Sequence, residues 1–444
     1  IAPEVVNNLG VRTALVERRA LATRINTVGY VHYDEDRLIH IHPRVEGWIE
    51  KLHVKAAGDP VARGQPLYEL YSPQLVNAQE ELLLALKRDN ERLVQAAEDR
   101  LLAEVEAHLG GLLVGLGEAD PMRPFTAETP ASVMTVTRDM IAPHLIGQDP
   151  TRIAIVESTL DDIVDENLTV RGAVNMALYD IIGKANDLPV HALLGGMRHG
   201  QLPLLFSVGS GTPEETVAVI QAQMETGCRC FMIKMGALPI ADEIKRLIAV
   251  KEQFGDAISI IIDANQGWEI DEAIDFIDGI RGYHPDLIEQ PIKRGDMEGL
   301  KRIHEHSPFL LSADESIATV NDAAELIREK AVDVFSIKIS KNGGLDKSRQ
   351  IAQMADGFGL QCLMNSMLEF GISQAASLQL GCTLANLIDL GHAYGSVLRM
   401  SDDITNFGQN ISDAVVTVPS VSGLGVTIDE EKLKHYTVDN LTIK

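Results

Sequence analysis

Short apolar runs, each ending in a polar or charged residue, recur through the second half of this 444-residue chain. A strand, a loop and an amphipathic helix together fill roughly 30 residues, so the spacing indicates alternating strands and helices. With residues 202–210 as a first strand, the pattern predicts an α/β fold with eight units, closed into a parallel (β/α) barrel, a modified TIM barrel. A doubly wound sheet is the alternative, but no Gly-rich dinucleotide turn follows the first strand. The runs end 24 to 29 residues apart, at Lys234, Asp263, Glu289, Asp314, Lys338, Asn365 and Asp389.

The first five of these run ends carry charges of both signs. The carboxyl ends of barrel strands open into one shared mouth, which is where enzymes of this architecture place their chemistry. A single charged strand end is usually a solvated tip, because charged side chains are rarely buried. Five in succession, in the order Lys, Asp, Glu, Asp and Lys, instead predict a functional site.

Three of the five are carboxylates: Asp263, Glu289 and Asp314. Carboxylates that converge on one mouth repel each other unless a cation lies between them. Mg²⁺ prefers such oxygen ligands, and Mn²⁺ can replace it. We therefore expect a divalent cation here, the alternative being three separate structural acids.

Two lysines, Lys234 and Lys338, end the strands before and after the acidic ones. On a closed barrel they would face each other across the metal. A lysine whose pKa is lowered by burial and nearby positive charge can act as a base near neutral pH. This arrangement suits removal of a proton next to the carboxylate of a small-molecule substrate. For one such lysine alone, a structural ion pair is the competing interpretation.

Composition excludes other classes of function. The formal net charge of −25 argues against nucleic-acid binding, which needs a basic surface. The apolar fraction of 45% is enough for large cores. No apolar stretch is long enough for a membrane-spanning helix.

The segment from Gly111 to Lys444 resembles the muconate-lactonising subgroup of the enolase superfamily. The motifs that carry the resemblance are GLGEADP, APHLIGQDP, NMALYDIIGKANDLPVHALLGG, IKMG, DANQGW, IEQP, SADES, IKISKNGG, MNSMLEFGIS and GLGVTIDEEKL. The resemblance implies a metal-dependent isomerase that passes through an enediolate, either cycloisomerase or racemase/epimerase, with Asp263, Glu289 and Asp314 as metal ligands. It implies Lys234 and Lys338 as the acid/base pair, a cytoplasmic homo-oligomer, and an α+β capping domain beside the barrel.

Five further residues close to these strand ends are candidates for supporting roles. Asn265 and Glu315 follow two of the acidic strand ends and are expected to position the ligands. Lys341 is expected to support its loop or the substrate carboxylate. Asn365 ends the seventh strand and Glu369 follows it, and Glu369 is equally compatible with a contact to a lysine or to substrate and with a structural role.

Three positions depart from relatives within the resemblance. The second strand usually ends Lys-x-Lys, and here Met232 replaces the first lysine. The eighth strand reads Asp389-Leu390-Gly391 where dipeptide epimerases carry Asp-x-Asp, which disfavours a dipeptide substrate. Asn365 stands where the mandelate-racemase subgroup has a histidine.

The first hundred residues differ in character and resemble a fragment of the periplasmic adaptor subunits of heavy-metal efflux pumps. The carrying residues are GWIEKLHV and GDPVARGQPLYELYSPQLV, which predict half of a lipoyl-like hairpin, and a helix is expected over residues 74–102. The expected organisation is an adaptor-like segment at 1–104, a partial cap at 105–200, the barrel at 201–405 and a return to the cap at 406–444. An adaptor without enzymatic function, with periplasmic placement, and an inactive chimera are the alternatives.

Overall fold

The computed structural model describes residues 48–54, 65, 67–73, 76–77, 79–80, 83–84 and 113–443. The chain divides into two compact units, Ile1–Gly111 and Leu112–Lys444. In the first unit, β1 (Trp48–Leu52) pairs antiparallel with β2 (Tyr68–Tyr71), where a hairpin was expected. The described residues between 76 and 84 are helical, and the rest of the adaptor-like prediction for residues 1–104 lies outside the described residues.

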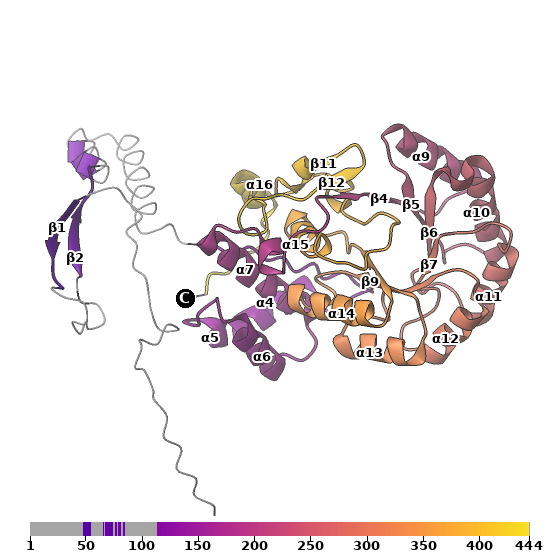
Figure 1. The fold of residues 1–444 in the computed structure, drawn as a ribbon, viewed down its shortest axis with the longest axis horizontal. Helices are drawn as coiled ribbons and strands as arrows, with labels where there is room; N and C mark the ends of the chain where they lie inside the picture. Colours follow the sequence, from indigo (N-terminus) through magenta and orange to yellow (C-terminus); the bar gives the residue numbers. More distant parts are fainter. Residues whose placement is uncertain are drawn as a thin grey trace, which may run out of the picture. The chain divides into compact units, whose positions relative to one another are not determined.

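The second unit is built around a parallel seven-stranded sheet with the strand order β10-β9-β8-β7-β6-β5-β4 (Figure 1). Neighbours in the sheet are neighbours in sequence, as expected for repeated strand–helix units. The predicted α/β barrel fold is therefore confirmed. The strands are β4 (Leu205–Val208), β5 (Cys230–Lys234), β6 (Ser259–Asp263), β7 (Leu287–Glu289), β8 (Leu311–Ala313), β9 (Val334–Ile337) and β10 (Gln361–Met364).

Helices follow the strands and cover the outside of the sheet (Figure 1). They are α9 (Pro213–Glu225), α10 (Ile240–Phe254), α11 (Ile270–Gly279), α12 (Met297–His306), α13 (Val320–Glu329), α14 (Leu345–Gly357) and α15 (Gly371–Gly381). Their starts are encoded locally: Thr212 and Glu215 form a reciprocal capping box at α9, and Thr319 and Asp322 form one at α13. Each box satisfies backbone N–H groups that a helix start otherwise leaves unpaired.

The barrel interior is filled by apolar side chains from alternate positions of the strands. Burial of each such side chain contributes about 1.5–3 kcal/mol. On β5, β6 and β7, the inward-facing position nearest the carboxyl end is charged. Lys234, Asp263 and Glu289 occupy this position, each two residues after an apolar interior residue. The interior cluster consists of Leu205, Met232, Ile261, Leu287, Val334, Leu363, Ile388 and Leu390.

The predicted eighth strand, ending at Asp389, is not a regular strand. Residues 386–392 close the barrel through isolated bridges, from Leu387 to Cys362 on one side and from His392 to Leu204 on the other. Ile388 and Leu390 point into the interior, so alternation turns Asp389 outward, where it is exposed. Asp389 therefore does not face the mouth of the barrel.

The cap consists of helices that precede the barrel in the sequence, one helix that follows it and a small sheet, β11-β12-β3. Residues 113–119 have no strand assignment and run as an extended segment. The elements are α4 (Pro130–Val136), η2 (Thr137–Ile141), α5 (Ala142–Leu145), α6 (Ile153–Ile163), α7 (Leu168–Asn186), α8 (Val190–Leu193), β3 (Gln201–Pro203), β11 (Ile411–Ser412), β12 (Val415–Thr417) and α16 (Glu430–Tyr436).

Asp180 on α7 ties three parts of the cap together. Its fully buried carboxylate accepts hydrogen bonds from the backbone N–H of Leu116 and of Leu424, both at 2.8 Å, and pairs with Lys184 at 2.6 Å. Backbone donors of the extended segment and of the C-terminal segment thereby find an acceptor without forming a sheet.

Asp180→Ala is expected to lower the free energy of unfolding by about 2 kcal/mol, because it leaves two backbone N–H groups without their acceptor. Urea unfolding followed by circular dichroism measures the change. Asp275→Ala, at an exposed position of α11, is the matched control and should change stability by less than about 0.5 kcal/mol. Equal stability of the two variants would contradict the bridging role.

Candidate active site

Three buried carboxylates stand in a row between two lysines. In the sheet, β6, β7 and β8 lie between β5 and β9. Asp263 and Glu289 end β6 and β7, and Asp314 follows β8 directly. Lys234 ends β5 and Lys338 follows β9, so the lysines flank the acids on both sides. All three carboxylate residues are 0% exposed.

Lys234 is held against the first acid of the row. The two residues are direct partners in strand register, and the ammonium donates to Asp263 Oδ2. It also donates to Asn265 Oδ1 at 3.0 Å, while the backbone N–H of Asn265 donates to Asp263 Oδ1 at 2.9 Å. Asn265 thus contacts both side chains.

Lys338 and Lys341 share the last acid of the row. Lys338 Nζ lies 2.6 Å from Asp314 Oδ2, and Lys341 Nζ lies 2.9 Å from Asp314 Oδ1. Lys341 also donates to the backbone carbonyl of Ser336 at 3.0 Å. Lys341 is buried within the loop that follows β9, and its ammonium ties that loop to Asp314.

Glu289, in the middle of the row, has neutral partners. Asn365 Nδ2 donates to Glu289 Oε1 at 2.8 Å and to Ser336 Oγ at 3.0 Å. Ser312 Oγ donates to the other carboxylate oxygen at 3.4 Å. The serines were not among the predicted site residues, although the alternation that puts Lys338 and Asp314 in the mouth places Ser336 and Ser312 two residues earlier on the same face.

The pKa values reflect incomplete compensation of negative charge. Burial, followed by the charges of Asp263 and Asp314, raises the pKa of Glu289 well above its ordinary value. Burial and the same two carboxylates raise the pKa of Glu315 to about 7. For Asp314, burial acts upward but Lys338 and Lys341 outweigh it and lower the pKa.

The pKa of Lys338 is raised in this arrangement, whereas a lowered pKa was expected of the lysine that acts as the base. Burial does act to lower it, but the carboxylates of Asp314 and Glu289 have the larger combined effect and raise the pKa. For Lys341, burial is the largest influence and the pKa is lowered. The difference arises because a second ammonium, that of Lys338, lies near Lys341.

The row has the donor chemistry for a hard divalent cation. Asp263, Glu289, Asp314 and Glu315 supply four buried carboxylates against the ammoniums of Lys234, Lys338 and Lys341. Glu315 Oε2 is buried and has no hydrogen-bond partner among the residues described. Within the described part of the chain, however, no three His, Cys, Asp or Glu side chains form a ready ligand cluster. The carboxylates of Asp263 and Asp314 instead form ion pairs with lysines.

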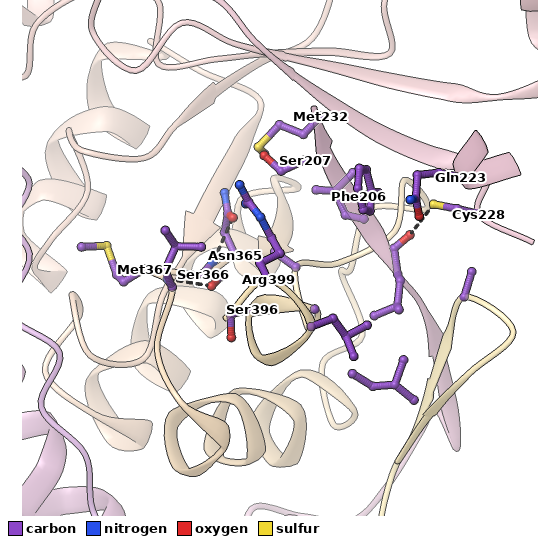
Figure 2. Close-up of a pocket in the computed structure, with 18 of the residues that line it drawn as sticks. Phe206, Ser207, Gln223, Cys228, Met232, Asn365, Ser366, Met367, Ser396 and Arg399 are labelled. Carbon is purple, nitrogen blue, oxygen red and sulfur yellow. Dashed lines mark hydrogen bonds between the residues drawn. The ribbon is translucent and has the colours of Figure 1, made fainter. Parts of the chain in front are cut away.

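A cavity of about 580 Å³ lies beside the row, and none of the three acids lines it. Both predicted catalytic lysines line it, and so do Asn265 and Asn365, whereas Glu315, Lys341 and Glu369 do not. The cap contributes Met122 and Phe125. Figure 2 shows the Met232 side chain among the lining residues, so the position that departs from Lys-x-Lys presents a thioether to the cavity.

Glu369 lies beneath the loop that forms one wall of this cavity. Its carboxylate accepts hydrogen bonds from Ser366 Oγ at 2.9 Å, the Met367 N–H at 2.5 Å and Gln374 Nε2 at 2.5 Å. Ser366, Met367 and Leu368 line the cavity. Of its two anticipated roles, the geometry favours the structural one, because Glu369 fixes the wall without reaching the cavity.

Two glycines allow the loops after β5 and β6 to meet above the site. Gly236 has φ of +81°, and a Cβ on it would collide with the Ala264 carbonyl and with Gly267. The left-handed backbone and the close approach both favour glycine. This contact holds the chain beyond Lys234 against the chain beyond Asp263, in the motifs IKMG and DANQGW.

Comparison with family models gives two matches that together span most of the chain. Residues 94–195 match "Mandelate racemase / muconate lactonizing enzyme, N-terminal domain", and residues 215–432 match "Enolase C-terminal domain-like". The first match begins inside the segment 1–104 that was assigned to an adaptor-like piece, so the domain boundaries remain predictions.

Individual relatives carry different activities. Muconate cycloisomerase 1 of Pseudomonas putida is 33% identical over 325 residues, covering 72% of this chain and 86% of the relative. L-Ala-D/L-Glu epimerase of Bacillus subtilis is 29% identical over 315 residues, covering 70% and 85%. The crystal structure of N-succinyl Arg/Lys racemase from Bacillus cereus superposes with a TM-score of 0.71 at 26% identity, covering 74% of this chain and 88% of that one. The relatives therefore include a cycloisomerase and two enzymes, an epimerase and a racemase, that invert a carbon centre.

Proposed function

This chain belongs to the mandelate racemase/muconate lactonizing enzyme family of the enolase superfamily, and we propose that within it the chain is a muconate-cycloisomerase-like enzyme of small carboxylates. Isomerases of the cycloisomerase and epimerase types are its relatives. In the proposed reaction, a proton next to a carboxylate moves to or from a lysine, and an enediolate lies between reactant and product. Racemisation or epimerisation uses the same pair of lysines and is the second candidate.

One observation carries the proposal: two lysines on either side of an acid row reach the same cavity. An α-carbon bound between Lys234 and Lys338 has a proton donor or acceptor on each side. Positioned side chains of this kind accelerate proton transfer by typically 10²–10⁴-fold. An ion pair that served only the fold would not need both ammoniums at the wall of one cavity.

The chain's own groups divide the work. Lys338 removes or returns the proton on one side of the substrate, and Lys234 does so on the other. Asn265 keeps the Lys234 ammonium directed along the cavity wall, and Lys341 keeps Asp314 in place. Met122 and Phe125 of the cap cover the cavity and limit access of water to the reacting carbon.

We propose that Asp263, Glu289 and Asp314 hold a divalent cation, with Mg²⁺ as the first choice and Mn²⁺ as an alternative. The uncompensated carboxylates and the unpartnered Glu315 oxygen support this assignment. When bound, such a cation stabilises negative charge that develops on the substrate's carboxylate oxygens. The carboxylate oxygens that would hold the cation are those that Lys234 and Lys338 contact.

Calorimetric titration of the full chain with MgCl₂ is expected to give one site per chain. Asp263→Asn and Glu289→Gln should each abolish it, because each removes a negative oxygen ligand from the row. Asp389→Asn is the matched control, since Asp389 ends an apolar run of the same period but faces outward. Unchanged Mg²⁺ binding in Asp263→Asn and Glu289→Gln would disprove the metal assignment whatever the catalytic activity.

Proton transfer is tested separately by exchange in D₂O, followed by NMR on muconolactone and on N-succinyl amino acids. Exchange next to the carboxylate that requires Mg²⁺ and disappears in Asp263→Asn would support the proposal. If wild-type protein with bound Mg²⁺ exchanges none of these compounds, the proposed reaction has to be replaced.

A further inference from the structure

The cavity contains a third cation that the proposed chemistry does not use. Arg399 lines it together with Lys234 and Lys338, and Figure 2 shows Arg399 among the labelled lining residues. The two lysines are paired with Asp263 and Asp314. For Arg399 the described residues provide no hydrogen bond or ion pair to the guanidinium, and its side chain is exposed to the cavity and solvent.

The backbone that carries Arg399 is firmly held. Arg399 caps the short helix η4 (Ser396–Leu398), and its N–H donates to the carbonyl of Ser396 at 2.9 Å. Ser396 Oγ in turn donates to the carbonyl of Glu369 at 2.6 Å. The guanidinium is therefore presented from a fixed base in the wall that also carries Ser366 and Met367.

Neighbouring acids in the sequence do not neutralise this arginine. Asp402 is engaged by Lys432 at 2.6 Å and by the Tyr436 hydroxyl at 3.2 Å. Asp413 also lines the cavity, but no contact joins it to Arg399 among the described residues. An arginine side chain without a hydrogen-bond or ion-pair partner among the described residues, in the wall of a cavity that also contains Met, Phe and Leu side chains, suits a bidentate carboxylate.

We propose that Arg399 is a specificity-determining residue that binds a second carboxylate of the substrate, separate from the carboxylate at the lysines. The inference rests on the proposed function, because it takes the lysine end as the reacting end. It narrows the substrate class to dianions. A cavity of about 580 Å³ has room for a molecule that spans both ends, since ligand pockets commonly measure about 300–1,000 Å³.

Matched compounds that differ only in the distal group test the inference. N-succinyl-norleucine and the methyl ester of its succinyl carboxylate form such a pair. Arg399→Gln is expected to lower kcat/KM for the free dianion by about 10- to 100-fold, mainly through KM. The ester, which lacks the second carboxylate, should change less than about twofold. Arg399→Lys should recover part of the loss.

A binding measurement keeps this test independent of turnover. Calorimetry compares glutarate with its monomethyl ester on the Mg²⁺-loaded protein, and wild type should prefer glutarate whereas Arg399→Gln should not. Arg328→Gln removes the same charge from the surface of α13 and serves as the control. The inference is overturned if wild type shows no preference for glutarate, or if Arg399→Gln affects both members of a pair equally. Absence of exchange with retained glutarate preference would refute the proposed reaction alone.

Discussion

Lys338→Met is expected to slow proton exchange next to the substrate carboxylate by about 10²- to 10⁴-fold, the usual contribution of a positioned acid or base. Lys338 is buried at the cavity wall, where its ammonium lies 2.6 Å from Asp314. The variant should still fold, because Lys341 continues to neutralise Asp314 from 2.9 Å. The effect therefore belongs to kcat and not to stability, and thermal unfolding measured beside the exchange rate separates the two.

The opposite lysine provides the matched control for this prediction. If the enzyme inverts a carbon centre, Lys338→Met should still exchange the enantiomer whose proton faces Lys234, and Lys234→Met should show the reverse preference. NMR of each pure enantiomer in D₂O measures both rates. Wild-type exchange rates for both enantiomers in Lys338→Met would show that this ammonium is structural.

Glu118→Gln is expected to remove roughly 3 kcal/mol of the change in folding stability between pH 4.5 and pH 8. Glu118, in the extended cap segment, accepts from the N–H of Phe370 at 2.6 Å and of Ser373 at 2.8 Å, at the start of α15. Burial is the main reason, with the charge of Glu369 added, that its pKa rises from 4.5 to about 7. A shift of one unit corresponds to 1.36 kcal/mol, which gives the roughly 3 kcal/mol.

The direction of this effect follows from proton binding. Between pH 4.5 and about 7 the folded chain holds a proton on Glu118 that the unfolded chain has lost. Stability from this group is complete below pH 4.5 and declines as the pH rises through about 7. Urea unfolding at pH 5 and pH 8 measures the difference, and the glutamine variant should show a smaller decline than wild type. Exposed Glu225→Gln is the control, and an identical decline in Glu118→Gln would contradict the assignment.

Two further carboxylates, those of Asp120 and Glu369, lie near this cavity wall and can be followed in the same pH experiment. The pKa of Asp120 is raised by burial and by the charge of Glu369, and the pKa of Glu369 is raised by burial. Because Glu369 holds the loop of Ser366 and Met367, protonation in this group of acids also bears on the shape of the cavity.

The sequence by itself determined the barrel and the composition of its mouth. Alternation along each strand requires that Lys234, Asp263 and Glu289 share the interior direction of Met232, Ile261 and Leu287. The 24- to 29-residue period then places them on neighbouring strands of a parallel sheet, where carboxyl ends meet. These are consequences of local geometry repeated along the chain, so no knowledge of distant contacts is needed.

Tertiary structure alone decided how those groups interact and what surrounds them. The irregular closure at residues 386–392 turned Asp389 outward, and the nearness of Asp314 and Glu289 raised the pKa of Lys338 instead of lowering it. Glu118 meets α15 across more than 250 positions of sequence, and Arg399 reaches the lysine cavity from a loop without any periodic signal. Electrostatic energies depend on distances of a few ångströms and on exclusion of water, and only the folded chain fixes both.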